Sequence, residues 1–180
     1  ARIVIHGQAS NGVGNAMAQG KIYIAGDIGA RGMTMTKHNP RFAPPELWVL
    51  GGVGDSFAEF MAGGTAVICG HEAHHPDNVL GHRPCVGMVG GRIFFRGPHR
   101  GFSDEDARPA EIGDEEWDWL CANLKEFLQA IGRGGLYEEL LSDRAAWRLL
   151  VARRPGEKGV KAVRSVADFR RFVWDQELGK

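Results

Sequence analysis

The sequence lacks several features that mark whole classes of protein. No apolar run approaches the roughly 20 residues of a membrane span, and no secretory signal is visible. Lys plus Arg and Asp plus Glu both total 22, so the formal net charge is zero and no basic field favours nucleic acid or an anionic membrane. The three cysteines are an odd number without the spacing of a disulfide framework. We therefore expect a cytoplasmic protein that binds neither nucleic acid nor membrane.

Nucleotide-binding loops are also missing. The stretch VLGGVGDS, residues 49–56, ends an apolar run in closely spaced glycines. A dinucleotide fingerprint needs G-x-G-x-x-G, and Phe57 stands where the third glycine should be. No G-x-x-x-x-G-K-[ST] occurs either. These glycines therefore need an architectural explanation.

Glycine is the residue in excess, with 26 of 180 residues, and its positions are periodic. Five strand-like runs each end in a glycine, at Gly7, Gly26, Gly51, Gly70 and Gly97. The intervals of 19, 25, 19 and 27 residues indicate a 19-residue unit with two insertions. The pattern M-x-x-G-x-h-h-h-x-G, with h apolar, recurs as MAQGKIYIAG, MAGGTAVICG and MVGGRIFFRG. Units this short bury their apolar faces by stacking on one another.

This period predicts a mainly β protein in which residues 1–100 form a right-handed parallel β-helix, a single-stranded β-solenoid. Each run should pair in parallel with the next, and two positions of each run should form an inner ladder: Ile3/Ile5, Ile22/Ile24, Leu47/Val49, Ala66/Ile68 and Ile93/Phe95. The position between them is also apolar: Val4, Tyr23, Trp48, Val67 and Phe94. Either the tail of the chain or another subunit must cover that outer stripe. Because the chain opens inside the first run, ARIVIHG, we expect residues upstream of Ala1.

Beyond Gly101 the pattern changes to helical periodicity, so residues 101–180 are predicted to be a C-terminal helical extension. The first helix should run from Asp114 to about Ile131, with its apolar residues on one face. Shorter helices are expected over 136–141 and 147–152. A last helix is expected to open at Ser165 and to include Trp174.

Candidate chemistry concentrates in the longest insertion, His71–His82. His71-Glu-Ala-His-His75 formally matches the zinc-protease pattern, but that chemistry needs a helix, and Pro76 follows at once. A looser metal site could draw on six side chains: Cys69, His71, His74, His75, His82 and Cys85. Asp55 and Glu59 are candidate paired carboxylates at ordinary corner positions. We assign no catalytic, cofactor-binding or metal residue from the sequence.

The repeat, with G-x-x-G corners followed by M-x-G-G-x-h-x-h-x-G, resembles the GXGXG-motif domain family over about residues 1–97. That domain forms the C-terminal β-helix of the glutamate synthase large subunit. Stand-alone relatives include one component of N-methylglutamate synthase-type complexes, to which the tail from GPHRGFS through LVARRPGEK is similar. The resemblance implies a structural subunit without catalytic residues of its own. Its implied partners are a class II glutamine amidotransferase subunit and an FMN and iron–sulfur synthase subunit, which carries both cofactors.

Two other functions remain open at this point. The chain could be the scaffold of formylmethanofuran dehydrogenase or of a formyltransferase/hydrolase complex, in which one component belongs to the same family. It could also be an autonomous enzyme or metal-binding protein that uses the His71–His82 loop.

Overall fold

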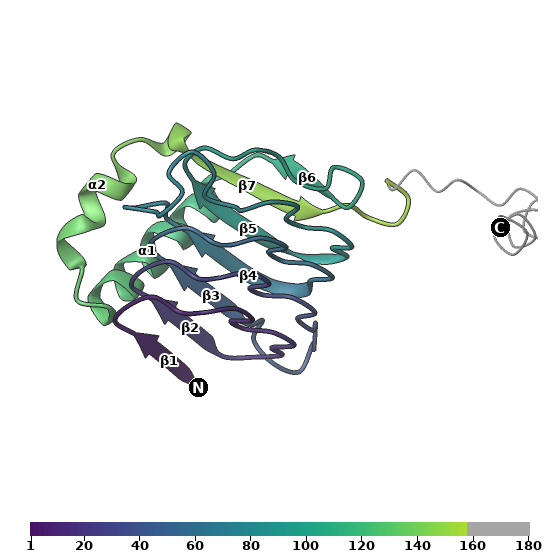
Figure 1. The fold of residues 1–180 in the computed structure, drawn as a ribbon, viewed down its shortest axis with the longest axis horizontal. Helices are drawn as coiled ribbons and strands as arrows, with labels where there is room; N and C mark the ends of the chain where they lie inside the picture. The colour runs from purple at the N-terminus through teal and green to yellow at the C-terminus, as the bar shows by residue number, and fades with distance from the viewer. Residues whose placement is uncertain (158–180) are drawn as a thin grey trace, which may run out of the picture.

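Seven strands form one mixed sheet in the computed structural model, which describes residues 1–157 of the chain. The strand order is β1-β2-β3-β4-β5-β7-β6, and the first five are parallel neighbours in chain order. β7 pairs antiparallel with β5, and β6 pairs antiparallel with β7. The strands are β1 (Arg2–Ile5), β2 (Lys21–Ile24), β3 (Glu46–Val49), β4 (Ala62–Ile68), β5 (Gly90–Arg96), β6 (Ala107–Ala110) and β7 (Trp147–Ala152). Figure 1 shows the parallel strands stacked, with each connection returning on the same side of the sheet.

The register of the parallel strands follows the glycine period. Arg2 pairs with Lys21, Lys21 with Glu46, Glu46 with Thr65 and Thr65 with Arg92. Each of these residues stands at the same distance before the glycine that ends its run. The prediction that successive runs pair in parallel and in phase is therefore confirmed.

The prediction of a right-handed parallel β-helix, or β-solenoid, is wrong. The described residues form a mixed α/β protein whose single sheet is mixed and not closed. The connections between the parallel strands are runs of turns, joined outside the named strands by two isolated bridges, so they build no second sheet. The physical reason is the backbone conformation of the connections, in which every second residue has a left-handed φ value. Examples are Met33 and Met35 (φ 54 and 55) and Ala58 and Phe60 (φ 58 and 54). Extended strands do not tolerate that alternation, and the glycine period does not reveal it.

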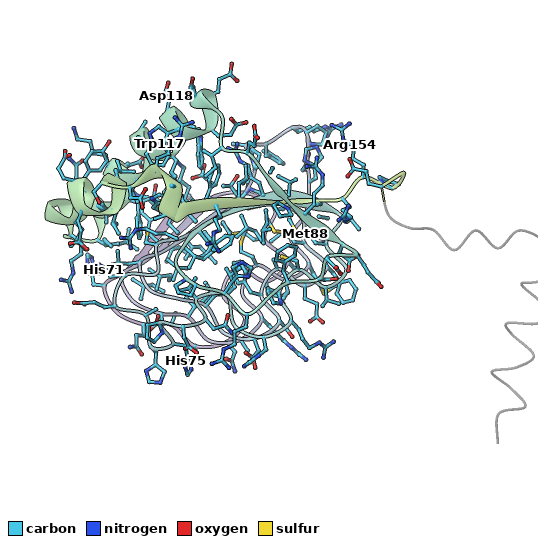
Figure 2. All side chains as sticks on the ribbon, turned by 90° about the horizontal axis from the view of Figure 1, so that it is seen from above. His71, His75, Met88, Trp117, Asp118 and Arg154 are labelled. Atoms are coloured by element: carbon cyan, nitrogen blue, oxygen red, sulfur yellow. The ribbon has the colours of Figure 1, made fainter. Side chains whose placement is uncertain are left out.

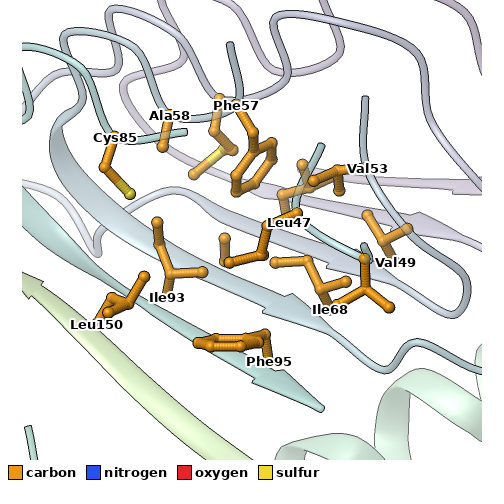
Figure 3. Packing of buried hydrophobic residues seen from close by; sticks show 14 of the residues in the cluster. Leu47, Val49, Val53, Phe57, Ala58, Ile68, Cys85, Ile93, Phe95 and Leu150 are labelled. Atoms are coloured by element: carbon orange, nitrogen blue, oxygen red, sulfur yellow. The ribbon is translucent and has the colours of Figure 1, made fainter. Parts of the chain in front are cut away.

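One hydrophobic core lies between the sheet and these connections. The predicted inner ladder supplies its strand side, and Figure 3 shows Leu47, Val49, Ile68, Ile93 and Phe95 packed together. The connections supply the other side with residues such as Val53, Phe57 and Cys85. The inner ladder is confirmed, with one exception: Ile3, on the open edge strand β1, is 56% exposed.

A second core covers the opposite face of the sheet. Tyr23, Trp48 and Phe94 are fully buried there beneath helix α1 (Asp114–Ala130). The ring centroids of Trp48 and Phe127 are 5.6 Å apart, and the Phe94 and Trp119 rings stack at the same distance. The chain's own tail therefore covers the apolar outer stripe, as one of the two alternatives predicted, and these residues offer no open face to a partner.

The tail combines two confirmed helices with one wrong prediction. α1 and α2 (Tyr137–Leu141) lie where helices were expected, and 3₁₀ turns at Gly134–Leu136 and Arg144–Ala146 flank α2. Residues 147–152 form strand β7 instead of a helix, because pairing with the free edge of β5 outweighs local propensity. The helix expected from Ser165 lies outside the described residues, and the division at residue 100 stays a prediction. Within residues 1–157, no helix has the length and apolarity that crossing a membrane would require.

Candidate functional site

The stacked connections form the face of the molecule opposite α1. Their backbones hydrogen-bond from layer to layer, as in Met33 N–H to Val13 O and Ala58 N–H to Gly32 O, both 2.8 Å. Packing is so close that a Cβ atom on Gly54 would lie 2.6 Å from the carbonyl carbon of Gly29. Backbone contact between layers leaves no room for a side chain at Gly54, which supports an architectural interpretation of the glycines in VLGGVGDS.

Two adjoining hollows run along this glycine row, with volumes of about 340 and 520 Å³. They share His75 and Asn78 in their walls, and we call them together the glycine groove. The polar side chains that line it are Gln8, Asp27, His74, His75, Asn78, Asp55, Asp77, His82 and Arg100. Concave sites with several polar groups are the usual places to look for binding or catalysis.

The acidic and amide groups of the groove are used to hold the long insertion against the stack. Asp27 accepts hydrogen bonds from the Gly52 N–H at 2.6 Å and from the His74 N–H at 3.2 Å. Asp55 accepts from the His82 N–H at 2.9 Å. Asn78, which is buried, donates to the Gly81 carbonyl at 2.9 Å. The two aspartates therefore fasten the His71–His82 loop to the stack at His74 and His82, and the Asn78 contact closes a turn within the loop.

Sequence reasoning missed the role of Asp27 and placed Asp55 in a different pairing. Asp27 directly follows the repeat glycine Gly26, where the next run carries Gly52. Its carboxylate occupies the space that a side chain at Gly51 would need. The residues at this position of the other runs are Gln8, Gly52, His71 and Pro98, so no recurring pattern signalled the role of Asp27. Asp55 binds the His82 amide, and Glu59 does not line the groove.

The candidate metal ligands are separated by the sheet. Cys69 belongs to the core beneath α1, whereas Cys85 belongs to the core on the other face. Burial raises the pKa of each thiol to about 12, so both stay protonated and are poor metal ligands. Among residues 1–157, no group of three or more His, Cys, Asp and Glu side chains could hold a metal ion.

The histidines of the HEAHH stretch do not lie together either. His71 lies beside α2, with its Nδ1 3.5 Å from the Glu139 carboxylate, whereas the His74 and His75 rings meet edge to face at 4.7 Å on the groove side. Figure 2 shows His75 projecting from the side of the molecule opposite Trp117 of α1. Residues 71–75 form no helix, so the zinc-protease arrangement does not exist here.

The groove walls contain neither a serine nor a threonine nor a cysteine, so no hydroxyl or thiol nucleophile stands beside the imidazoles there. The aspartate contacts hold the histidine-bearing loop against the stacked connections. The surface of that loop is then available for contact with other molecules.

Comparison with known protein families gives a match. The family model described as GXGXG motif matches residues 2–112, which is more than half of the chain and runs from β1 through β6. A comparison with curated proteins found no match.

Proposed function

The chain belongs to the GXGXG motif family, which is found in glutamate synthase-like proteins, and we propose that it is a non-catalytic structural subunit of a glutamate synthase-like complex. Its proposed partners are a class II glutamine amidotransferase subunit, which would release ammonia, and an FMN and iron–sulfur synthase subunit, which would use it. Within that class, the resemblance of the tail favours an N-methylglutamate synthase-type complex.

One observation supports a structural role above the others. All three carboxylates that line the glycine groove are engaged by the chain itself: Asp27 and Asp55 by backbone amides, and Asp77 by the Arg100 guanidinium. A general acid or base must direct a lone pair or a proton at its substrate. Carboxylates that instead hold a loop in place serve architecture.

The cysteines support the placing of the cofactors on a partner. Iron–sulfur clusters are held by cysteine thiolates, commonly four. This chain has three cysteines, and two of them lie buried on opposite faces of the sheet. The residues present therefore do not fit a cluster, and we assign the cluster and the FMN to the synthase subunit.

Purification of the native complex through a tag on this chain tests the proposal. We expect a flavin and iron–sulfur absorption spectrum and glutaminase activity in the tagged complex. A pterin cofactor or a formyltransferase partner would instead place the chain in the formyl-transfer assemblies and overturn the proposal.

Variants in the groove then test whether the subunit is non-catalytic. Replacing His74 and His75 together by alanine should leave turnover unchanged, because the proposed role uses neither imidazole for chemistry. The matched control is Asp27→Ala, which removes two amide partners and should lower thermal stability without changing turnover per assembled complex. Loss of turnover in the histidine variant, with assembly and flavin content intact, would show that this chain supplies a catalytic group.

A further inference from the structure

A row of exposed apolar side chains crosses the stacked connections near the point where they lead back into the strands. Layer-to-layer hydrogen bonds from Ala16, Met35 and Phe60 place these residues at the same position of three successive layers. Met35 is 59% and Phe60 55% exposed. Val89, two residues beyond the equivalent Gly87, extends the row into the fourth layer and is 62% exposed. We call Ala16, Met35, Phe60 and Val89 the apolar row.

The side chain of Phe60 reaches the next layer. A Cβ atom on Gly87 would collide with the Phe60 ring, so the ring lies directly against the Gly87 backbone. None of the four residues of the row lines either hollow of the glycine groove, so the row is separate from the surface that carries His74 and His75.

The row combines a left-handed backbone with exposed apolar side chains. Ala16, Met35 and Phe60 all adopt left-handed φ values of 54 to 55, which bulky L-residues rarely adopt. The fourth layer places glycine at this position, as the backbone prefers. Met35 and Phe60 also leave most of an apolar side chain in water. The left-handed backbone comes from the stacking of the layers, since buried Met33 and Ala58 share it. Stacking does not explain the exposed apolar side chains of Met35 and Phe60, whereas contact with another molecule does.

Two exposed basic side chains follow the row in the insertion after β2. Lys37 and Arg41 are exposed in the insertion that follows Met35, and neither has an ion pair among the described residues. Phe42, in the same insertion, adds another exposed apolar side chain. Glu59 is the acidic neighbour of the row and is half-buried. Unpaired cations around an apolar centre complement a partner with the reverse charge.

We propose that the apolar row is the docking surface for another subunit of the complex, which contributes apolar side chains flanked by carboxylates. This inference rests on the proposed scaffold function and specifies which surface performs it. Large, partly rigid anchors such as Phe60, surrounded by a charged rim, are the arrangement that concentrates binding energy at protein interfaces.

Photo-cross-linking in the native complex tests the surface directly. With p-benzoylphenylalanine in place of Phe60, we expect a cross-link to a different subunit, at a peptide that contains apolar and acidic residues. The control places the same group at Arg31, an exposed left-handed position in the Met35 layer, and should give little of that product. Cross-links to a second copy of this chain only, or none, would overturn the proposal.

Glycine substitution separates binding from folding. In Met35→Gly/Phe60→Gly, affinity for the partner should fall about a hundredfold, since each interface anchor contributes roughly tenfold. The melting temperature of the chain should stay the same or rise, because glycine relieves the left-handed backbone. The control Arg31→Gly/Ser56→Gly gives the same relief at φ values of 59 and 55 and should keep the partner. Unchanged binding in the row variant, or loss of binding together with a lower melting temperature, would overturn the proposal.

The two proposals fail in different ways. If the native complex holds partners other than a glutaminase and a flavin subunit, but the Phe60 cross-link forms, the proposed function fails and the docking surface stands. If those two partners are recovered with the chain and neither cross-links to position 60, the docking surface alone fails.

Discussion

Gly91 is the position where close stacking of the layers is most directly testable. It precedes the apolar part of β5 with φ +91, outside the range that L side chains readily adopt. A Cβ atom there would lie 2.6 Å from the Met61 methyl carbon and 2.9 Å from the Gly64 carbonyl oxygen of the preceding layer. The methionine end can move, but the backbone oxygen is held by the sheet. Gly91→Ala therefore combines backbone strain with a steric clash.

Three other glycines separate these contributions. Gly54 has the clash without the strain, since its Cβ would meet Gly29 and Ala30 backbone atoms at 2.6 and 2.7 Å. Gly132, just beyond α1, has the strain without the clash, with φ +73 and nothing within 4 Å. Gly135 has neither. The four alanine variants form a complete two-by-two comparison within one chain.

The expected changes in the free energy of unfolding follow from the backbone strain and the steric clash at each position. Gly135→Ala should be stabilising by about 0.5 kcal/mol, because alanine restricts the unfolded chain. Gly132→Ala should cost about 1 kcal/mol after left-handed strain is set against that gain. Gly54→Ala should cost about 2 kcal/mol, as overpacking against fixed backbone does. Gly91→Ala should cost about 3 kcal/mol, close to the sum of the strain and clash terms.

Urea unfolding followed by tryptophan fluorescence measures these differences, because Trp48 is buried against α1 and becomes exposed on unfolding. For a chain of this size, 3 kcal/mol corresponds to a fall of about 10 °C in melting temperature. If Gly91→Ala and Gly54→Ala proved no worse than Gly132→Ala, the layers would not be in backbone contact, and the architectural explanation of the glycine period would be refuted.

Two further predictions concern titrating groups. In the native chain at pH 8, a thiol reagent should modify the partly exposed Cys121 but neither Cys69 nor Cys85. Burial raises the pKa of both of these thiols to about 12, so they stay protonated at pH 8. Rapid modification of all three cysteines before unfolding would contradict this prediction. Burial, with a smaller effect from Arg148, lowers the pKa of His99 below its usual value of about 6.5, so stability should be lost as pH falls from 6.5 through the lowered pKa. Urea midpoints at pH 7 and pH 5 should differ less in His99→Asn than in the unaltered chain, and an equal difference in both would exclude His99 as the cause.

The strand register was predictable because its signal is repeated. Each run ends in a glycine at the same phase, and the three apolar residues before it alternate between the two faces of the sheet, as successive residues of a strand do. A slip of one residue would move Leu47 and Val49 from one core to the other, so the period defines both faces at once. The apolar outer position, represented by Trp48, likewise indicated that something had to cover it.

The connections and the end of the sheet were not predictable in the same way. The residue types at Met35 and Phe60 do not predict a left-handed backbone, because their φ values are imposed by hydrogen bonds to neighbouring layers. The segment 147–152 has a sequence compatible with a helix and becomes β7 because β5 has an unpaired edge. Pro109, in β6, has no N–H to donate and lies where the sheet ends.

The candidate site was likewise predictable only in part. The sequence identified the loop that carries His71, His74 and His75, but not which of them share a surface. That depended on Asp27, 47 residues before His74, whose carboxylate receives the His74 amide across the stack. No local pattern records such a contact.

By itself, the sequence determined which residues pair across five parallel strands and which faces are apolar, because a periodic pattern in one dimension is enough to set register. Only the tertiary structure decided that the returning segments are chains of turns and not a second sheet, that the tail adds two antiparallel strands, and that α1 covers the outer face. Each of these depends on hydrogen bonds and packing between segments far apart in the chain, which a local sequence pattern does not record.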